Sequence, residues 1–299
     1  MGDELSRDLQ EALRQVAERC GADLADAKIV HQHSNTAIAL PTARLLVRVA
    51  GTPDSLDRVA TSVHVTRWLA HRGYRCVEPV DLDPFTAAGH VISVWRLLDT
   101  VDRPSGTARE LADLLRTLHE QPQPSVGLPS LDDPFASVAA AVARQRDGLD
   151  DHDREWLLTR IAELRRGWAD VRPARPKGLI HGDAHTNNLI RLAAGGVVLG
   201  DWDHVAWGPR EWDLIQPHYM ARRFGRHTAE DLDDFTTAYG WDVREWSGFE
   251  QLLQTREITG LSPYVRKAAD DDWSRDELKR RVATLRGGDS LARWSSPSG

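Results

Sequence analysis

Residues 178–190 read GLIHGDAHTNNLI, and residues 197–204 read VVLGDWDH. In both stretches a short apolar run, typical of a buried strand, is followed directly by a cluster of polar residues. Side chains at the end of a strand are held more rigidly than side chains on a loop, and a site needs that rigidity. Asp183, Asn188 and Asp201 carry the oxygen donors that Mg²⁺ prefers. We therefore expect these clusters to form the functional site.

The spacing of these residues indicates a reaction. A His-x-Asp motif followed by four residues and an Asn is the pattern of a kinase catalytic loop, and a second Asp after a β-hairpin matches the metal-binding Asp of that site. Phosphoryl transfer needs an acceptor hydroxyl in line and cations on the phosphate oxygens. The pattern predicts that Asp183 accepts or orients the hydroxyl proton, and that Asn188 and Asp201 hold Mg²⁺ on a nucleotide.

The sequence around this stretch changes character near residue 98. The first part predicts an opening helix that ends at Gly21, a helix at 56–71, and strands at 28–33, 36–40, 43–50, 76–80 and 91–95. The second part predicts mostly helices, one around 111–118 and others at 134–147, 151–169, 210–224, 228–239, 248–259 and 274–286. We expect an α+β protein with a strand-rich lobe at 1–98 and a larger helical lobe at 99–299.

Composition excludes several classes of protein. The chain has 299 residues and a formal charge of −7, whereas a protein that binds nucleic acid through its phosphates is expected to be basic. Its two cysteines are too few for a disulfide framework. No run approaches the roughly 20 apolar residues that span a bilayer, and Met1 to Gly21 has no apolar core of the signal-peptide type. We expect a cytoplasmic protein with no nucleic-acid or membrane partner.

With the stretch GPREWDL at 208–214, the two motifs resemble the aminoglycoside phosphotransferase family. The resemblance implies a two-lobed protein-kinase-like fold with a small β-rich N-terminal lobe that binds the nucleotide. It implies an enzyme that transfers the γ-phosphoryl group of ATP or GTP to a hydroxyl of a small molecule, with Mg²⁺ as cofactor. The acceptors of the family include antibiotics such as aminoglycosides and are not limited to them.

The resemblance also assigns roles to individual residues. Asp183 resembles the catalytic base, and His181 resembles the residue that braces its loop. Asn188 and Asp201 resemble the metal ligands, with Asp203 supporting a second metal or the acceptor side. Asp213 resembles the buried acid that anchors the loop from the following helix.

In the N-terminal lobe, Arg48 occupies the position of the cation that binds the nucleotide phosphates, which is usually Lys in the family. The segment VWRLL at 94–98 resembles the hinge that receives the purine through backbone groups, which implies contacts at Trp95 and Leu97. The segment HQHSNT at 31–36 occupies the position of the phosphate-covering loop, so Ser34 and Asn35 are expected near phosphate.

Two features depart from the family pattern. The segment 31–36 contains no glycine, and Ser62 stands where the family commonly has the Glu that pairs with the phosphate-binding cation. Either the nucleotide site is looser than usual in the family, or another acid pairs with Arg48.

Two other functions fit parts of the sequence. A metal-dependent hydrolase would use a histidine and aspartate cluster, because these side chains ligate Zn²⁺ or Fe²⁺, and the available residues are His181, Asp183, His185, Asp201 and His204. This interpretation leaves Asn188 and the two-lobe layout unexplained. A nucleotide- or drug-binding protein that has lost catalysis is the other alternative, and the intact Asp183, Asn188 and Asp201 argue against it.

The acceptor site is expected among the helices after Arg226. The acidic residues there are Glu230, Asp231, Asp233, Asp234, Asp270, Asp271 and Asp272, with basic residues interspersed. A polycationic aminoglycoside would need several converging carboxylates, and exposed ones are screened by solvent. The sequence therefore favours a less charged acceptor, such as a sugar, a nucleoside or a lightly cationic antibiotic.

Overall fold

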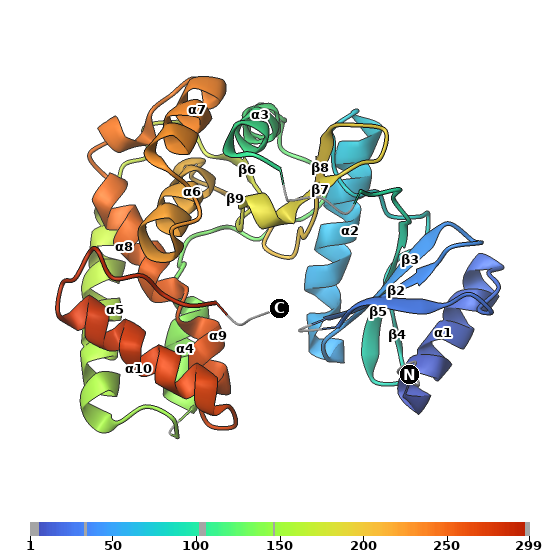
Figure 1. Cartoon of the computed structure of the whole chain (residues 1–299), viewed down its shortest axis with the longest axis horizontal. Helices are drawn as coiled ribbons and strands as arrows, with labels where there is room; N and C mark the ends of the chain where they lie inside the picture. Colours follow the sequence, from blue (N-terminus) through green and yellow to red (C-terminus); the bar gives the residue numbers. More distant parts are fainter. Residues whose placement is uncertain (1–5, 33–34, 102–105, 146, 297–299) are drawn as a thin grey trace. The chain divides into compact units, whose positions relative to one another are not determined.

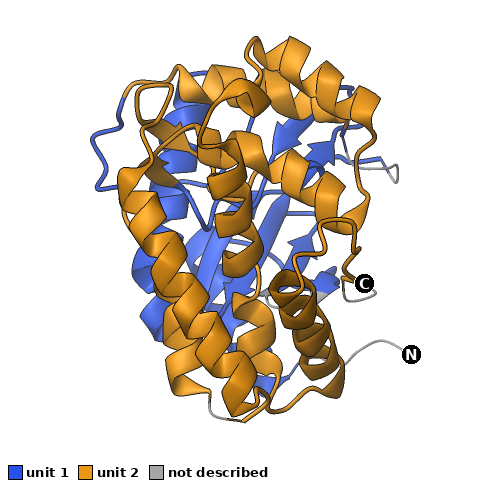
Figure 2. Cartoon of the chain, turned by 90° about the vertical axis from the view of Figure 1, so that its left-hand side faces the viewer, with its two compact units in different colours: residues 1–106, 123–128, 186–205 blue, residues 107–122, 129–185, 206–299 orange. Residues whose placement is uncertain are grey.

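The computed structural model describes residues 6–32, 35–101, 106–145 and 147–296. The chain forms two compact units, and each draws on several stretches of sequence (Figure 2). The first unit comprises residues 1–106, 123–128 and 186–205, and the second comprises 107–122, 129–185 and 206–299. The expected division at residue 98 into a nucleotide lobe and an acceptor lobe is a functional one and stays a prediction.

The first unit is built on an antiparallel sheet of five strands in the order β1-β2-β3-β5-β4 (Figure 1). The strands are β1 (Lys28–Gln32), β2 (Asn35–Leu40), β3 (Leu45–Ala50), β4 (Phe85–Ala87) and β5 (His90–Arg96). Strand β3 lies at the centre, and all of its residues pair with both β2 and β5. This strand carries Arg48, so the sheet fixes the backbone of Arg48 from both sides.

Helix α1 (Arg7–Cys20) packs against the sheet through Leu9, Leu13 and Val16, which share a core with Val47 and Val49. Successive side chains of a strand point to opposite faces. Because Val47 and Val49 face the helix α1 core, Arg48 points to the other face of the sheet.

Helix α2 (Leu56–His71) packs through Val59 against Ala50 of β3 and Val91 of β5. It follows a short 3₁₀ turn, Pro53–Ser55, in which the proline occupies the first helical position that its fixed φ favours. Ser62 of α2 is buried at 1% exposure, and its hydroxyl oxygen has no hydrogen-bond partner among the described residues.

A second hairpin, β7 (Leu189–Arg191) and β8 (Val197–Leu199), completes the first unit. The turn between the strands places Gly195 and Gly196 at φ 95° and 77°, a conformation that glycine adopts without steric cost. Backbone bridges from Leu199 to Cys76 and from Leu192 to Thr100 attach the hairpin to the rest of the unit.

The second unit is mostly helical. Its helices are α3 (Ala108–His119), α4 (Ala136–Arg144), α5 (Asp151–Asp170), α6 (Glu211–Phe224), α7 (Ala229–Tyr239), α8 (Phe249–Thr259), α9 (Ser262–Lys267) and α10 (Asp272–Arg286). A short antiparallel pair, β6 (Gly178–Ile180) and β9 (Ala206–Gly208), leads into the first polar cluster. One core gathers α4, α5, α8, α9 and α10, and a second gathers β6, α6 and α8.

The α+β class and most elements are confirmed, one predicted strand is wrong, and two elements, β4 and α9, were not predicted. Residues 76–80 form no strand, because Pro79 lacks an N–H and the segment makes only isolated bridges from Cys76 and Pro79. The edge strand is β4 instead, joined to β5 by a tight turn with positive φ at Ala88 and Gly89. The short helix α9 was not expected, and Pro263 lies in its first turn.

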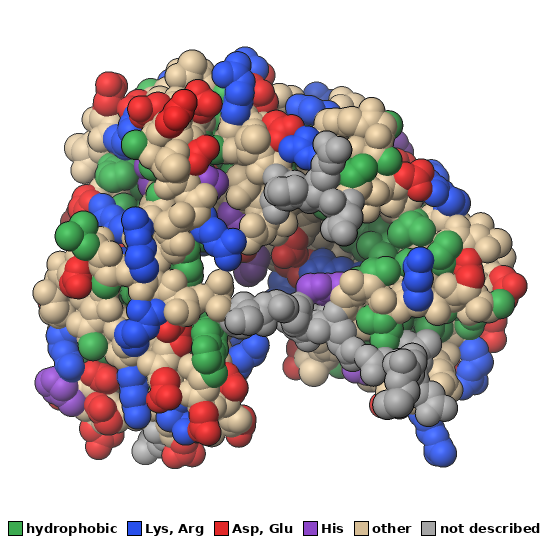
Figure 3. All heavy atoms as spheres, in the orientation of Figure 1, with side chains coloured by type: hydrophobic (Ala, Val, Ile, Leu, Met, Phe, Trp, Pro, Cys, Tyr) green, Lys and Arg blue, Asp and Glu red, His purple; other side chains and the backbone are tan. Residues whose placement is uncertain are grey.

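Charged side chains of both signs are distributed over the surface, and acidic ones gather over α7 (Figure 3). Within the described part of the chain, no helix is long and apolar enough to cross a membrane.

His218 of α6 makes the stability of the fold dependent on pH. Its side chain is 5% exposed, and burial, with a smaller effect from the Arg244 cation, lowers its pKa to about 4. An unfolded chain binds the proton at a pKa of about 6.5. Protonation therefore favours the unfolded state, so the free energy of unfolding falls as the pH drops from about 6.5 towards 4.

The effect of His218 can be isolated by substitution. Between pH 7 and pH 5 this one residue should cost about 2 kcal/mol of unfolding free energy. H218Q should flatten the pH dependence measured by urea unfolding, whereas H152Q, at an exposed histidine of α5, should not. Equal pH slopes for wild type and H218Q would contradict the assignment.

Candidate functional site

The loop that carries the first polar cluster is anchored by Asp213, a fully buried residue in the first turn of α6. Its carboxylate accepts the backbone N–H of His181 at 2.7 Å and that of Gly182 at 2.8 Å. Strand β6 ends at Ile180, so these two N–H groups belong to the first residues after the strand. The contact that the resemblance implies for Asp213 is present.

Two further side chains support the Asp213 carboxylate. His119 of α3, 1% exposed, places Nε2 at 3.1 Å from Asp213 and Nδ1 at 2.8 Å from the hydroxyl of Tyr239. An ionised carboxylate only accepts hydrogen bonds, so Nε2 donates and the Tyr239 hydroxyl can donate to Nδ1. Burial raises the pKa of Tyr239 to about 12, which keeps that hydroxyl protonated. A buried carboxylate is stable only with such partners.

His181 and Asp183 lie in this anchored loop. His181 is fully buried, and its Nδ1 accepts the backbone N–H of Asp183 at 3.3 Å. Its ring therefore braces the peptide of the residue expected to act on the acceptor hydroxyl.

The Asp183 side chain is held by groups from two helices. Arg256 of α8 donates from Nη2 to Asp183 Oδ1 at 2.6 Å, and Gln216 of α6 donates to the same oxygen at 3.0 Å. The imidazole Nε2 of His185 lies 3.6 Å from Oδ2. About a third of the Asp183 side chain, 31%, is accessible to solvent, so its carboxylate is both fixed and reachable.

The hairpin of the first unit brings Asn188 and Asp201 together. Leu189 pairs with Leu199, and the N–H of Gly200 donates to the carbonyl of Asn188 at 2.8 Å. Asp201 follows Gly200 with φ 55°, a left-handed conformation that is uncommon outside glycine. Strained backbone of this kind clusters at functional sites. The two residues expected to hold a metal therefore lie next to the same end of the hairpin, Asn188 just before β7 and Asp201 shortly after β8.

Arg48 contacts the polar cluster of the same unit. Its guanidinium forms a two-pronged ion pair with Asp203, at 2.8 and 2.7 Å, and reaches Asp201 at 3.2 Å. The Arg48 and Asp203 side chains are 17% and 13% exposed, and Asp201 is 48% exposed. Of the two alternatives for Arg48, the structure shows the second: an acid outside α2, Asp203, pairs with it.

The remaining predicted nucleotide contacts lie in the first unit. Trp95 is buried in β5, and the N–H of Leu97 donates to the carbonyl of Arg44 at 2.8 Å. Asn35 begins β2 and pairs with Ala50 through the backbone. Ser34 lies outside the described residues. The nucleotide roles of all four stay predictions.

The residues of the histidine and aspartate cluster of the hydrolase alternative are divided between the two units, with His181, Asp183 and His185 in the second and Asp201 and His204 in the first. Among the residues that the structure describes, no three His, Cys, Asp or Glu side chains are placed to hold a metal ion together. Of the five residues proposed for that cluster, Asp183 and His185 approach each other in the second unit, at 3.6 Å.

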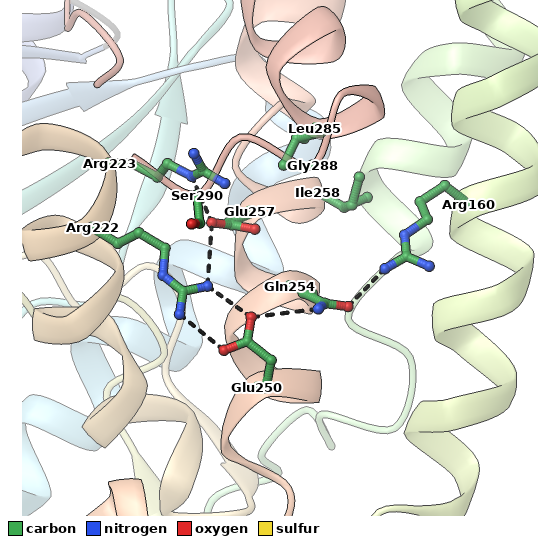
Figure 4. A pocket seen from close by; sticks show the side chains of 10 residues that line it. All are labelled: Arg160, Arg222, Arg223, Glu250, Gln254, Glu257, Ile258, Leu285, Gly288 and Ser290. Atoms are coloured by element: carbon green, nitrogen blue, oxygen red, sulfur yellow. Dashed lines mark hydrogen bonds and ion pairs between the residues drawn. The ribbon is translucent and has the colours of Figure 1, made fainter. Parts of the chain in front are cut away.

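A cavity of about 170 Å³ lies elsewhere in the second unit, among α5, α6, α8 and the chain after α10 (Figure 4). The charged side chains that line the cavity pair with one another. Arg222 forms a two-pronged pair with Glu250, and buried Arg223 pairs with buried Glu257 at 2.6 Å. Arg160 pairs with Glu163 and Gln254. This pattern is typical of a structural ion network, and the cavity does not contain Asp183.

Sequence reasoning missed several side chains that lie far away in the sequence but support the candidate base and its loop. These are His119, Gln216, Tyr239 and Arg256. Gln216 lies four residues after Trp212 on α6, so helical spacing indicates that they share a face, but no sequence pattern links Arg256 to Asp183.

Comparison with known proteins gives a family match. Residues 26–251 match the family model described as "Phosphotransferase enzyme family". A search of the curated proteins found no match.

Several solved structures share the fold. An amicoumacin kinase, hAmiN, in complex with AMP-PNP, Ca²⁺ and Ami has 12% sequence identity and a TM-score of 0.69, with 96% of each chain covered. Choline kinase LicA from Streptococcus pneumoniae has 15% identity and a TM-score of 0.68, with 93% of this chain and 99% of that chain covered. The GDP and kanamycin complex of APH(2")-IIia has 13% identity and a TM-score of 0.65, with the same shares covered.

At these identities the solved structures show the fold alone, which is the α+β arrangement of protein-kinase-like phosphotransferases. The family model covers well over half of the chain. The chain therefore belongs to the phosphotransferase enzyme family.

Proposed function

We propose that this protein transfers the γ-phosphoryl group of ATP or GTP to a hydroxyl of a small, weakly charged acceptor, with Mg²⁺. The observation that carries the proposal is the contact of Arg48 with Asp201 and Asp203, which joins the expected phosphate-binding cation to the expected metal ligands. Similar structures in complex with AMP-PNP or GDP support the choice of a nucleotide as donor.

Asp183 acts on the acceptor in this proposal. Its carboxylate accepts or orients the hydroxyl proton as the oxygen attacks phosphorus, and the loop bonded to Asp213 keeps it in place. His181 braces the peptide of Asp183 from within the same loop.

Asn188 and Asp201 fit a hard cation, because their donors are an amide oxygen and a carboxylate and the hairpin places them at the same end. Asp203 is the third oxygen donor of this group. When bound, Mg²⁺ would neutralise charge on the nucleotide phosphates.

Arg48 binds the nucleotide phosphates in this proposal. An arginine keeps its charge at all physiological pH values and matches phosphate oxygens with its planar fork. Asp203 holds this fork in the role that a glutamate of α2 would otherwise have, with Ser62 in that position.

The acceptor is expected to be weakly charged, because four of the acidic residues named after Arg226 have partners within the protein. The Asp231 carboxylate accepts the backbone N–H of Thr228, the N-cap residue of α7, and Asp233 pairs with Arg244. Asp271 caps α10, and Asp272 pairs with Arg275. A polycationic acceptor would find few carboxylates to bind its amines.

A coupled screen tests the function. Purified protein with Mg²⁺ and ATP or GTP should consume nucleotide, and one compound of a panel should gain the mass of one phosphate. The panel should contain sugars, nucleosides, choline, amicoumacin-type antibiotics and aminoglycosides. Nucleotide binding without transfer to any of them would support the binding-protein alternative. Tightly bound zinc in the purified protein would favour the hydrolase.

Asp183→Asn should lower the transfer rate by about 10²–10⁴-fold, because an amide cannot accept the hydroxyl proton. Nucleotide affinity, measured by calorimetry with Mg²⁺, should stay near that of the wild type. Near-normal turnover in a folded Asp183→Asn protein would remove Asp183 from the mechanism.

Arg48→Ala should raise the KM for nucleotide roughly tenfold or more, and Arg48→Lys should restore only part of the loss, because lysine lacks the planar fork. Arg44→Ala is the matched control, since Arg44 makes the same two-pronged contact with exposed Asp99. An equal KM for Arg48→Ala and Arg44→Ala would contradict the phosphate role.

A further inference from the structure

Arg256 is a cation on α8 that no sequence motif links to the catalytic loop. Its Nη2 lies 2.6 Å from Asp183 Oδ1. The Arg256 side chain is 12% exposed, so water screens this ion pair less than it screens an exposed one. From this geometry we propose that Arg256 is a positioning residue for Asp183. The inference rests on the proposed function of Asp183.

The contact fixes the orientation of the carboxylate. Gln216 donates to the same Oδ1 at 3.0 Å, so two donors from two helices meet on one oxygen. Two donors on one oxygen restrict rotation of the carboxylate about its bond to Cβ.

Arg256 is itself held on two sides. Its Nε donates to Gln216 Oε1, which joins the two donors into one unit. Its guanidinium lies over the ring of Trp212, 4.7 Å from the ring centroid, and cations are attracted to such a face.

Trp212 connects this unit to the loop backbone. Its indole N–H donates to the carbonyl of Gly182 at 2.9 Å, directly before Asp183. One face of α6 therefore supplies Trp212 under the arginine and Gln216 beside it, while Asp213 holds the N–H groups of the same loop. Helix α6 therefore contacts both the loop backbone before Asp183 and, through Gln216, the Asp183 side chain, while α8 contacts that side chain through Arg256.

Close packing of α8 against α6 brings Arg256 near Asp183. A Cβ on Gly260, the C-cap of α8, would lie 2.5 Å from the Tyr219 hydroxyl oxygen, so glycine leaves room for the Tyr219 side chain of α6 at this end of α8. The helix pair thus presents Arg256 to Asp183 as part of a packed core that also contains Leu252 and Leu253.

The test compares R256M, R256K and R160M. R256M removes the charge and the fork, and R256K keeps the charge. R160M is the matched control, because Arg160 contacts Gln254 on α8 and does not contact Asp183. Transfer is measured with Mg²⁺, nucleotide and the acceptor found in the screen. The second readout needs no turnover: the ¹³C resonance of the Asp183 carboxyl carbon, assigned by its loss in Asp183→Asn.

R256M should lower kcat by roughly ten- to a hundredfold, because a misplaced catalytic group costs on that scale. The KM for nucleotide should stay within about twofold, since Arg256 has no part in phosphate binding. The Asp183 resonance should move in R256M and return towards the wild-type position in R256K, with kcat partly restored. R160M should leave both readouts unchanged.

Unchanged kcat and an unchanged Asp183 resonance in R256M would overturn the inference. A fall in kcat with no movement of the resonance would also overturn it, because Arg256 would then act elsewhere. A wild-type protein that transfers no phosphate contradicts the proposed function instead, and the resonance still reports whether Arg256 holds Asp183.

Discussion

The buried carboxylate of Asp213 is the constraint on which the rest of the candidate site depends. It accepts the N–H groups of His181 and Gly182 and a hydrogen bond from His119, all within 3.1 Å. A buried charge is expensive unless such partners surround it, so the loop and α3 are held where their donors reach this carboxylate of α6. Because the Asp213 carboxylate needs hydrogen-bond donors where it is buried, it fixes the backbone of the loop that carries Asp183.

The first unit satisfies a similar requirement by a different route. Arg48 is placed by the central strand of the sheet, and its charge is matched by Asp203 and Asp201 at the end of a hairpin. An acid of the polar cluster thus takes the place of a partner on α2, where Ser62 stands. In the proposed function this pair holds the phosphate-binding cation and the metal ligands together.

Sequence patterns predicted the fold class and most helices. They could do so because the residues that pack in the cores recur with the period of a strand or a helix, and the pattern changes from mostly strands to mostly helices near residue 98. The spacing of Asp183, Asn188 and Asp201 predicted a phosphoryl-transfer site from the sequence alone, and the roles of these residues stay predictions. The prediction of a strand at 76–80 was wrong, because this segment contains a proline and forms isolated β-bridges in place of continuous strand pairing. Arg256 and His119 could not be found, since their partners lie far away in sequence and no period connects them.

The Asp213 carboxylate is expected to hold in place the loop that carries Asp183. Amide hydrogen exchange measures this directly, because the N–H groups of His181 and Gly182 are protected only while they are hydrogen-bonded. In D213N at least one of the two amides should exchange about tenfold faster or more than in the wild type, because the Asn side chain keeps one acceptor oxygen and places an NH₂ donor where the other oxygen was. The amides of Leu157 and Ile161 in the α5 core should stay protected. Wild-type exchange rates at His181 and Gly182 in D213N would contradict the account.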